Sequence, residues 1–364
     1  MDGNFLLSKV LGTFPYKSTK NGYRVNAYLV VYNFVIILWV IADFSFFVNF
    51  VAPSMAMTNV QSLVIITEKL SSILGATVPV FMIASNVARI NSVQRRIRIL
   101  DRLLASINIH PRSYRYHSVG VFLIANIFFA VFIEGDFSKG RMRIISTLIM
   151  YSLLLGSALR IYHDVTAILC RSEAINEEMS KLKFELATSK NYTAEQTSNV
   201  ADKIKKLHIL CDCNESVCLL AETTNCMFSS QILLMLSISL VHAIIHTTQM
   251  SWSTHAGATT LLDTILFLVS KLAMVIVDVE MVAFVVVSCA RVTDETRRFN
   301  VLLYQTMLFS KTSATRTDHK LRMNLISNWS VEFSAGGFFN VTYTLFQSLI
   351  GTAANFIFII KQFG

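Results

Sequence analysis

Long apolar runs separated by polar segments are the most regular feature of the chain. A helix needs about 20 apolar residues to cross a hydrocarbon core of about 30 Å, and seven stretches approach or exceed that length. They are continuous apolar runs rather than the alternating pattern of strands, which argues against a transmembrane β-barrel. The pattern predicts an all-α membrane protein with seven transmembrane helices, at residues 26–50, 59–85, 118–133, 144–162, 219–246, 261–290 and 338–360.

The distribution of Lys and Arg predicts how the helices are oriented. Positively charged residues concentrate in the cytoplasmic links of membrane proteins. The amino-terminal segment and the three even-numbered links contain about 25 Lys and Arg residues, whereas the opposite side contains 4. We therefore expect a cytoplasmic N-terminus and an extracellular C-terminus. This is the reverse of a G-protein-coupled receptor, so that class is disfavoured.

Composition supports the membrane assignment and limits the possible functions. The chain is 53% hydrophobic and has a mean hydropathy of +0.53, both above the range of soluble domains. Cytoplasmic loops facing anionic lipid account for the net charge of +9, so no nucleic-acid partner is expected. No phosphate-binding glycine loop, nucleophile elbow or His-Glu-x-x-His motif is present. We expect neither an enzyme nor a cofactor.

The polar links divide the chain into segments. The link 166–218 carries charges at helical spacing with a break at 187–194, which predicts helical extensions of the fourth and fifth spans. An amphipathic pattern over 297–310 predicts that the sixth span continues into the cytoplasm, and a second helix is expected over 320–333, ending at Gly336-Gly337. The resulting segments are 1–25 (cytoplasmic), 26–165 (spans one to four), 166–218 (cytoplasmic extensions), 219–290 (spans five and six), 291–337 (cytoplasmic helices) and 338–364 (the last helix).

Ionisable residues inside the spans are the candidates for chemistry, because such groups are costly in a membrane and often functional. Asp263, Lys271 and Asp278 fall within an arc of about 80° on the sixth span. Their partners must lie on other helices, and both structural pairing and ligand contact remain open. His242 and His246 lie four residues apart and could share a metal, but no third ligand is evident, so we predict no metal site.

The end of the chain resembles the carboxy-terminal signature of insect gustatory receptors. The resemblance rests on residues 332–341, on Gly351-Thr352 and on the ending Gln362-Phe363. The family signature is Thr-Tyr, five mostly hydrophobic residues and Gln-Phe. Here Asn355 and Phe356 replace Thr and Tyr, and Lys361 replaces a hydrophobic residue. The close resemblance covers residues 291–364, about a fifth of the chain.

This resemblance implies a ligand-gated, non-selective cation channel in a plasma membrane, in sensory neuron dendrites. The family assembles as a tetramer, here with identical or different gustatory subunits, around a pore lined by a split last helix. Gln362 and Phe363 then correspond to the outer gate, and Lys361 lies at the pore mouth. Lys361 could face the pore, where four lysines repel cations, or it could extend away to the membrane interface. The divergent signature favours a receptor for bitter or other non-sugar tastants.

The family also places the ligand pocket among the outer halves of the second to sixth spans. On that basis the ligand-binding candidates are Glu68, Lys69, Tyr151, Asp263 and Lys271. The alternatives are an odorant-receptor-type channel subunit, a membrane transporter or a non-conducting accessory subunit. A transporter is disfavoured because no inverted repeat or broken midplane helix is visible.

Overall fold

A computed structural model describes most of the chain beyond residue 86. The described residues are 16–19, 22–25, single positions within 31–45 and 66–78, 86–111, 141–188, 194–253, 261–310 and 312–363. The predicted spans at 26–50 and 118–133 therefore lie largely or wholly outside the described residues.

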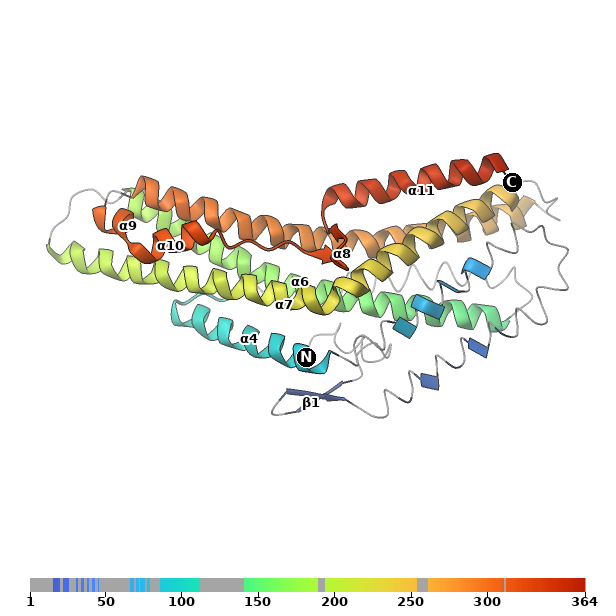
Figure 1. Ribbon diagram of the computed structural model, residues 1–364, viewed down its shortest axis with the longest axis horizontal. Coiled ribbons are helices and arrows are strands. Elements are labelled where there is room, and N and C mark those ends of the chain that lie inside the picture. The colour runs from blue at the N-terminus through green and yellow to red at the C-terminus, as the bar shows by residue number, and fades with distance from the viewer. Residues whose placement is uncertain are drawn as a thin grey trace.

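Three long helices form the body of the protein (Figure 1). They are α6 (Arg141–Thr188), α7 (Ala194–Ser253) and α8 (Leu261–Phe309), and each packs against the other two. At 1.5 Å per residue they are about 70 to 90 Å long, more than twice the thickness of a hydrocarbon core. Each helix therefore extends beyond a membrane, as the sequence predicted for the fourth to sixth spans.

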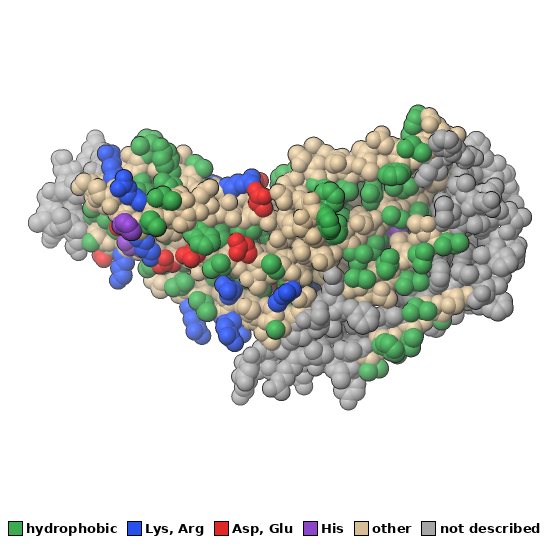
Figure 2. Space-filling model, viewed as in Figure 1, with side chains coloured by type: hydrophobic (Ala, Val, Ile, Leu, Met, Phe, Trp, Pro, Cys, Tyr) green, Lys and Arg blue, Asp and Glu red, His purple; other side chains and the backbone are tan. Residues whose placement is uncertain are grey.

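Among the described residues, three helical stretches are long and apolar enough to cross a membrane. They are Tyr151–Thr188, Val200–Met250 and Thr264–Phe309, and Tyr343–Ile359 is a shorter apolar helix. Figure 2 shows charged side chains gathered on the half of the molecule that carries α4, α9 and α10. Hydrophobic side chains predominate on the visible part of the other half. This division separates a polar end of the bundle from a membrane-suited end.

Ion pairs and amide contacts join the three helices at the polar end. Arg291 of α8 lies 2.7 Å from Glu173 of α6, and Asn176 donates to the Glu295 side chain at 2.6 Å. Lys203 of α7 pairs with Glu185 of α6 at 3.1 Å. Polar contacts of this kind are expected where long helices leave the membrane and their surfaces meet water.

The Arg-rich link after the second span contains an amphipathic helix that was not expected from the sequence. Helix α4 (Val87–Ser106) packs against α7 and buries Leu100 and Leu104 completely. Asp101 accepts bidentate hydrogen bonds from Arg171 of α6, at 2.8 and 2.9 Å. An N-terminal hairpin of β1 (Tyr16–Thr19) and β2 (Gly22–Val25) was also not predicted.

Helix α9 (Ser313–Thr317) and helix α10 (His319–Ser327) follow α8. Asp318 caps α10 by accepting from Leu321 N–H at 2.9 Å, and it also contacts His208 of α7 at 2.9 Å. Burial by itself raises the pKa of Asp318, but the hydrogen bonds from Leu321 and His208 outweigh it and lower the pKa below its ordinary value. The short helix is thereby fixed to α7.

The predicted helix over 320–333 was wrong in its second half. Helix α10 ends at Ser327 because Asn328 adopts a left-handed conformation with φ 44°. Asn300 of α8 donates to the Asn328 side chain and to the Trp329 carbonyl, both at 2.9 Å. Tertiary contacts therefore hold residues 329–333 as a non-helical segment, with Val331 and Phe333 buried.

A small hairpin attaches the start of the last helix to α7. It consists of β3 (Ser334–Ala335) and β4 (Phe339–Asn340), joined by a turn at Gly336 and Gly337. Asn225 of α7 accepts from Ser334 N–H at 3.0 Å, and the Ser229 carbonyl accepts from Gly336 N–H at 2.8 Å. The two glycines were expected to end a helix, but they form the hairpin turn instead.

Gly336 gives a test of this attachment. Both glycines have positive φ, 60° at Gly336 and 78° at Gly337, so an alanine at either costs about 1 kcal/mol in backbone strain. A Cβ at Gly336 lies 2.6 Å from Cδ2 of Leu233 on α7, whereas one at Gly337 meets open space. Gly336→Ala is therefore expected to lower stability by about 2 kcal/mol and Gly337→Ala by about 1 kcal/mol.

The measurement is thermal unfolding of the two purified variants in detergent. Because both substitutions introduce the same backbone strain, the difference between their melting temperatures reports the contact with Leu233. Equal melting temperatures would show that the hairpin is not packed tightly on α7.

The last helix, α11 (Tyr343–Phe363), begins five residues later than predicted because Phe339 and Asn340 belong to β4. Leu345, Phe346 and Leu349 pack against the core, while most of the remaining surface is exposed. In Figure 1, α11 lies along one side of α7 and α8. Helices α10 and α11 are thus separate elements, which agrees with a split last helix.

Candidate functional site

A cluster of buried polar side chains joins α6, α7 and α8 within their apolar stretches. The Tyr151 hydroxyl of α6 lies 3.0 Å from Nε2 of His246 on α7 and donates to Oδ2 of Asp278 on α8 at 3.3 Å. His242 lies one turn from His246, with its Nδ1 3.8 Å from Oδ1 of Asp278. All four residues are at most 4% exposed. Polar groups buried this deeply in apolar spans are costly and mark functional candidates.

The second predicted span adds two residues to this cluster. Ser71 Oγ lies 2.9 Å from Nε2 of His242, and it donates to the Glu68 carbonyl at 2.8 Å. The Glu68 carboxylate accepts from Gln249 of α7 at 2.9 Å. The cluster Glu68, Ser71, Tyr151, His242, His246, Gln249 and Asp278, called the polar cluster below, therefore links four segments of the chain.

Lys271 is buried on α8, about two helical turns from Asp278. It is 2% exposed, and its Nζ lies 5.6 Å from the centre of the Phe267 ring. A cation over an aromatic face is stabilised by the ring quadrupole, most strongly where water is excluded.

The structure brings some of the predicted ligand-binding candidates together. Tyr151 and Glu68 belong to the polar cluster, and Lys271 lies near it. The side chains of Lys69 and Asp263 lie outside the described residues. The cluster also contains residues that were not among the ligand candidates. These are Ser71, His242, His246, Gln249 and Asp278.

Two sequence signals pointed to the missed residues. The four-residue spacing of His242 and His246 suggested a shared metal, but their ring nitrogens contact Ser71 and Tyr151. No group of His, Cys, Asp and Glu suited to a metal ion occurs among the residues that the structure describes. Asp278 was recognised as a costly intramembrane charge, and its contacts are with Tyr151 of α6 and His242 of α7, on other helices as expected.

A narrow crevice of about 60 Å³ separates α11 from α7 and α8. Asp278 contributes to its wall from the side of the polar cluster, as does Ser239 of α7. The facing wall is apolar and consists of Phe346, Leu349, Ile350 and Ala353 of α11. Asp278 is thus the residue that belongs both to the polar cluster and to the contact with the last helix.

The outward side of α11 carries a stripe of small and polar residues, which is interrupted between Asn355 and Gln362 by the exposed side chains of Phe358 and Ile359. At 100° per residue, the stripe positions fall within an arc of about 60°, roughly opposite the residues that face the core. All of them are exposed. They are Thr344, Ser348, Gly351, Asn355 and Gln362.

The degenerate family motif lies on the same helix. Phe356, next to Asn355, is 50% exposed. The side chains of Lys361 and Phe363 lie outside the described residues.

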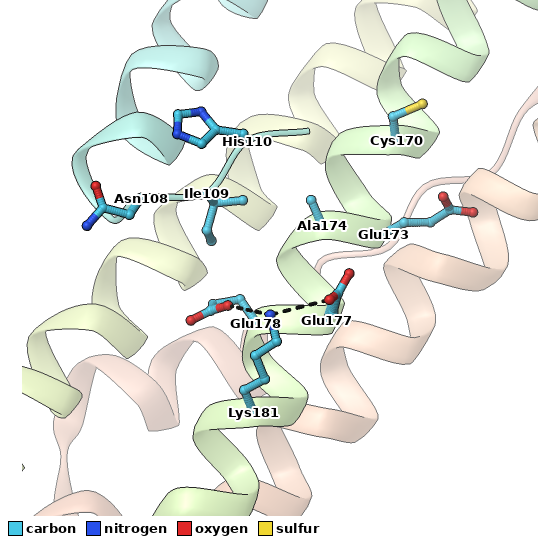
Figure 3. A pocket seen from close by; sticks show the side chains of 9 residues that line it. All are labelled: Asn108, Ile109, His110, Cys170, Glu173, Ala174, Glu177, Glu178 and Lys181. Carbon is cyan, nitrogen blue, oxygen red and sulfur yellow. Dashed lines mark hydrogen bonds and ion pairs between the residues drawn. The ribbon is translucent and has the colours of Figure 1, made fainter. Parts of the chain in front are cut away.

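A second, more polar pocket of about 230 Å³ lies at the polar end, between the end of α4 and α6 (Figure 3). Lys181 sits between Glu177 and Glu178 at 3.3 Å from each, and Glu178 also accepts from Lys206 of α7. Glu173 on the same wall pairs with Arg291. The three carboxylates that line this pocket are therefore neutralised by basic partners, which is typical of a solvated ion-pair network.

Comparison with known proteins identifies the family. The chain matches the model of the 7tm chemosensory receptor family over residues 3–364. It is a member of that family. This assignment agrees with the resemblance in the last fifth of the sequence and extends it to the whole chain. Chemosensory receptors are not a class of enzyme. No curated protein sequence matches this chain.

Two solved structures of an insect olfactory receptor, OR5 from Machilis hrabei, share the receptor's fold. The structure in complex with eugenol has a TM-score of 0.61 at 10% sequence identity, and the second has 0.59 at 9%. Each comparison covers 100% of the receptor and 97% of OR5. At such low identity the likeness shows the fold alone.

Proposed function

We propose that the receptor is a subunit of a ligand-gated, non-selective cation channel of the gustatory type, in the plasma membrane of sensory neurons. The observation that carries this proposal is the polar stripe of α11. A lone apolar helix facing lipid gains nothing from a row of exposed polar residues. The same row suits a helix that lines a water-filled path, where polar side chains and a glycine replace part of an ion's hydration.

Exposed apolar side chains at the polar end support assembly into a tetramer. Val301, Tyr304, Leu308 and Phe309 of α8 are about half exposed, and Ile326 of α10 is 76% exposed. Apolar groups beyond the membrane-suited part have no lipid to cover them, so a clustered set favours a protein interface. We propose that these residues contact neighbouring subunits, either identical chains or other gustatory receptors.

The outer gate is assigned to Gln362 and Phe363. Gln362 is exposed and lies on the polar stripe. Phe363 follows it by one residue, about 100° around the helix, so its role rests on the family resemblance. Position 361 is also about 100° from Gln362 in helical register. This places Lys361 off the stripe, which favours a lysine that extends to the membrane interface rather than into the pore.

The polar cluster is proposed to form the floor of the ligand site. Glu68, Tyr151 and Lys271 supply a carboxylate, a hydroxyl and an ammonium group, and Lys69 and Asp263 are proposed to complete the site. A ligand that interacts differently with two arrangements of this cluster shifts the channel towards one of them. Binding of eugenol by OR5 shows that a receptor of this fold accepts a small organic molecule.

The proposed stimulus is a bitter or other non-sugar tastant, because the Thr-Tyr part of the signature is replaced by Asn355-Phe356. The second candidate is an odorant-type channel subunit, which the fold shared with OR5 favours. The ending Gln362-Phe363 supports the gustatory assignment.

The test is whole-cell recording from cells that express the receptor alone, with surface tetramers verified by native electrophoresis. Sugars, bitter alkaloids and volatiles are applied in turn. A cation current evoked by an alkaloid supports the proposal, and a response confined to volatiles favours the odorant-type alternative. Absence of current with all three classes, despite surface tetramers, argues against a channel formed by this chain alone.

A further inference from the structure

In the polar cluster, α7 and α8 each contribute one buried atom that has no hydrogen-bond partner among the described residues. They are Nδ1 of His242 and Oδ1 of Asp278, 3.8 Å apart. Both side chains are 1% exposed. A buried, unpartnered pair of this kind carries a free-energy penalty unless something satisfies it.

The neighbouring hydrogen bonds determine which ring nitrogen of neutral His242 carries the proton. Ser71 has one hydroxyl proton, and it donates that proton to the Glu68 carbonyl at 2.8 Å. Its contact with Nε2 of His242, at 2.9 Å, is then a hydrogen bond only if Nε2 is the donor. The Nδ1 atom of a neutral ring is consequently an acceptor. It faces a carboxylate oxygen, which is also an acceptor.

Two acceptors that face each other require a donor, and the distance between them limits where that donor can lie. A nitrogen or oxygen donor lies about 2.8 Å from each acceptor, so a group placed in line between them needs a gap of about 5.6 Å. The observed 3.8 Å is too short for that position, so a bridging donor has to lie beside the line that joins the two atoms. A proton on either atom needs only a movement of about 1 Å to form a direct charge-assisted hydrogen bond.

The described charged groups around the pair have a summed charge of −1 when the histidines are neutral. The second-span segment contributes Glu68, α6 contributes Tyr151, α7 contributes His246 and α8 contributes Lys271. The residues of α11 that line the crevice beside Asp278 carry no titratable group. With neutral histidines, these described groups amount to two carboxylates and one ammonium, so proton uptake brings the set to neutrality.

The pair also lies against the last helix. Asp278 lines the crevice to α11, and Ser239 and Ala243 of α7, which flank His242 in sequence, line the same crevice. Closing the gap between His242 and Asp278 draws together the two helices on which α11 rests. We propose that His242 and Asp278 form a proton-binding site, and that proton uptake there changes how α11 packs against α7 and α8. This proposal does not depend on the ligand or on ion conduction.

The first test uses protons as the probe and thermal unfolding of the purified full-length receptor in detergent. Wild type is expected to gain about 2 °C between pH 7.5 and pH 5.5 relative to His242→Gln and to Asp278→Asn. Asp278→Asn carries an amide donor that can satisfy His242 without a proton. Because one proton is shared, the double variant should lose no more of the pH effect than either single variant. His110→Gln, at an exposed histidine outside the cluster, is the control and should behave as wild type.

The second test measures the movement of α11 without depending on the stability of the variants. Spin labels are placed at exposed positions by Ser237→Cys on α7 and Ala354→Cys on α11, with the exposed native thiol removed by Cys226→Ser. The distance between the labels is expected to change by roughly 2 Å between the two pH values and to stay constant with Asp278→Asn. Identical pH dependence of wild type and both single variants, or a pH-independent label distance, overturns the proposal and leaves a bound water as the donor.

Discussion

Replacing Asn355 with leucine is expected to reduce the single-channel conductance of the receptor at least tenfold. Asn355 lies in the middle of the exposed polar stripe of α11. In a tetramer, four leucines at this level form an apolar ring, and a narrow apolar ring excludes water and the ions that water carries. The measurement is single-channel recording, together with surface labelling to show that the variant reaches the membrane in normal amounts.

The neighbouring position provides the matched control. Ala354 is also exposed but lies about 100° around the helix from Asn355. Ala354→Leu introduces the same side chain off the stripe and should leave the conductance close to that of wild type. Equal losses in the two variants would contradict a pore lined by the stripe. Such losses would instead indicate that any enlargement of this part of α11 is harmful.

Replacing Tyr151 with phenylalanine is expected to raise the half-effective concentration of an agonist about tenfold. The Tyr151 hydroxyl lies between His246 and Asp278 and connects α6 to both α7 and α8. Its removal leaves buried polar groups without a partner, at a cost of about 1–3 kcal/mol. A loss of 1.4 kcal/mol in the liganded state corresponds to a tenfold change in affinity. Concentration–response curves for the best agonist of wild type measure the effect.

Tyr162→Phe is the control for this prediction. Tyr162 lies on the same helix, and its ring packs edge-on against Phe284, so the substitution makes the same chemical change outside the polar cluster. It should leave the concentration–response curve near that of wild type. If Tyr151→Phe also has no effect on the curve, the polar cluster is structural and the ligand site lies elsewhere.

The long helices could be predicted because apolar runs and amphipathic patterns extend over most of their length. The apolar run at 261–290 and the amphipathic pattern at 297–310 together anticipated the single helix α8, which ends at Phe309. The predicted break at 187–194 likewise falls between the end of α6 at Thr188 and the start of α7 at Ala194.

Short elements were harder to predict because tertiary contacts decide them. Residues 329–333 continue a helical pattern in sequence. However, Asn300 donates hydrogen bonds to Asn328 and to the Trp329 carbonyl, and α10 ends before them. The strands around Gly336 exist because Asn225 and the Ser229 carbonyl of α7 bond to them. A local pattern contains no information about these partners, which lie 28 to 109 positions away.

The candidate site shows the same limit. The cost of burying a charge in a membrane marked Lys271 and Asp278 from sequence alone, and the family resemblance marked Glu68. Helical periodicity could place residues on one face of one helix, but it could not show that Tyr151 reaches both His246 and Asp278. The partners across helices depend on how the helices are rotated against one another, which packing determines.

In the proposed channel, the last helix of this receptor lines a cation-conducting pore. Reconstitution of the purified receptor into planar bilayers, with cysteine at position 355 or 354 and a charged, membrane-impermeant thiol reagent added during recording, tests it most directly. We expect a cation current that the reagent blocks with Asn355→Cys and leaves intact with Ala354→Cys. Absence of current from verified tetramers, or equal block of both variants, would contradict it.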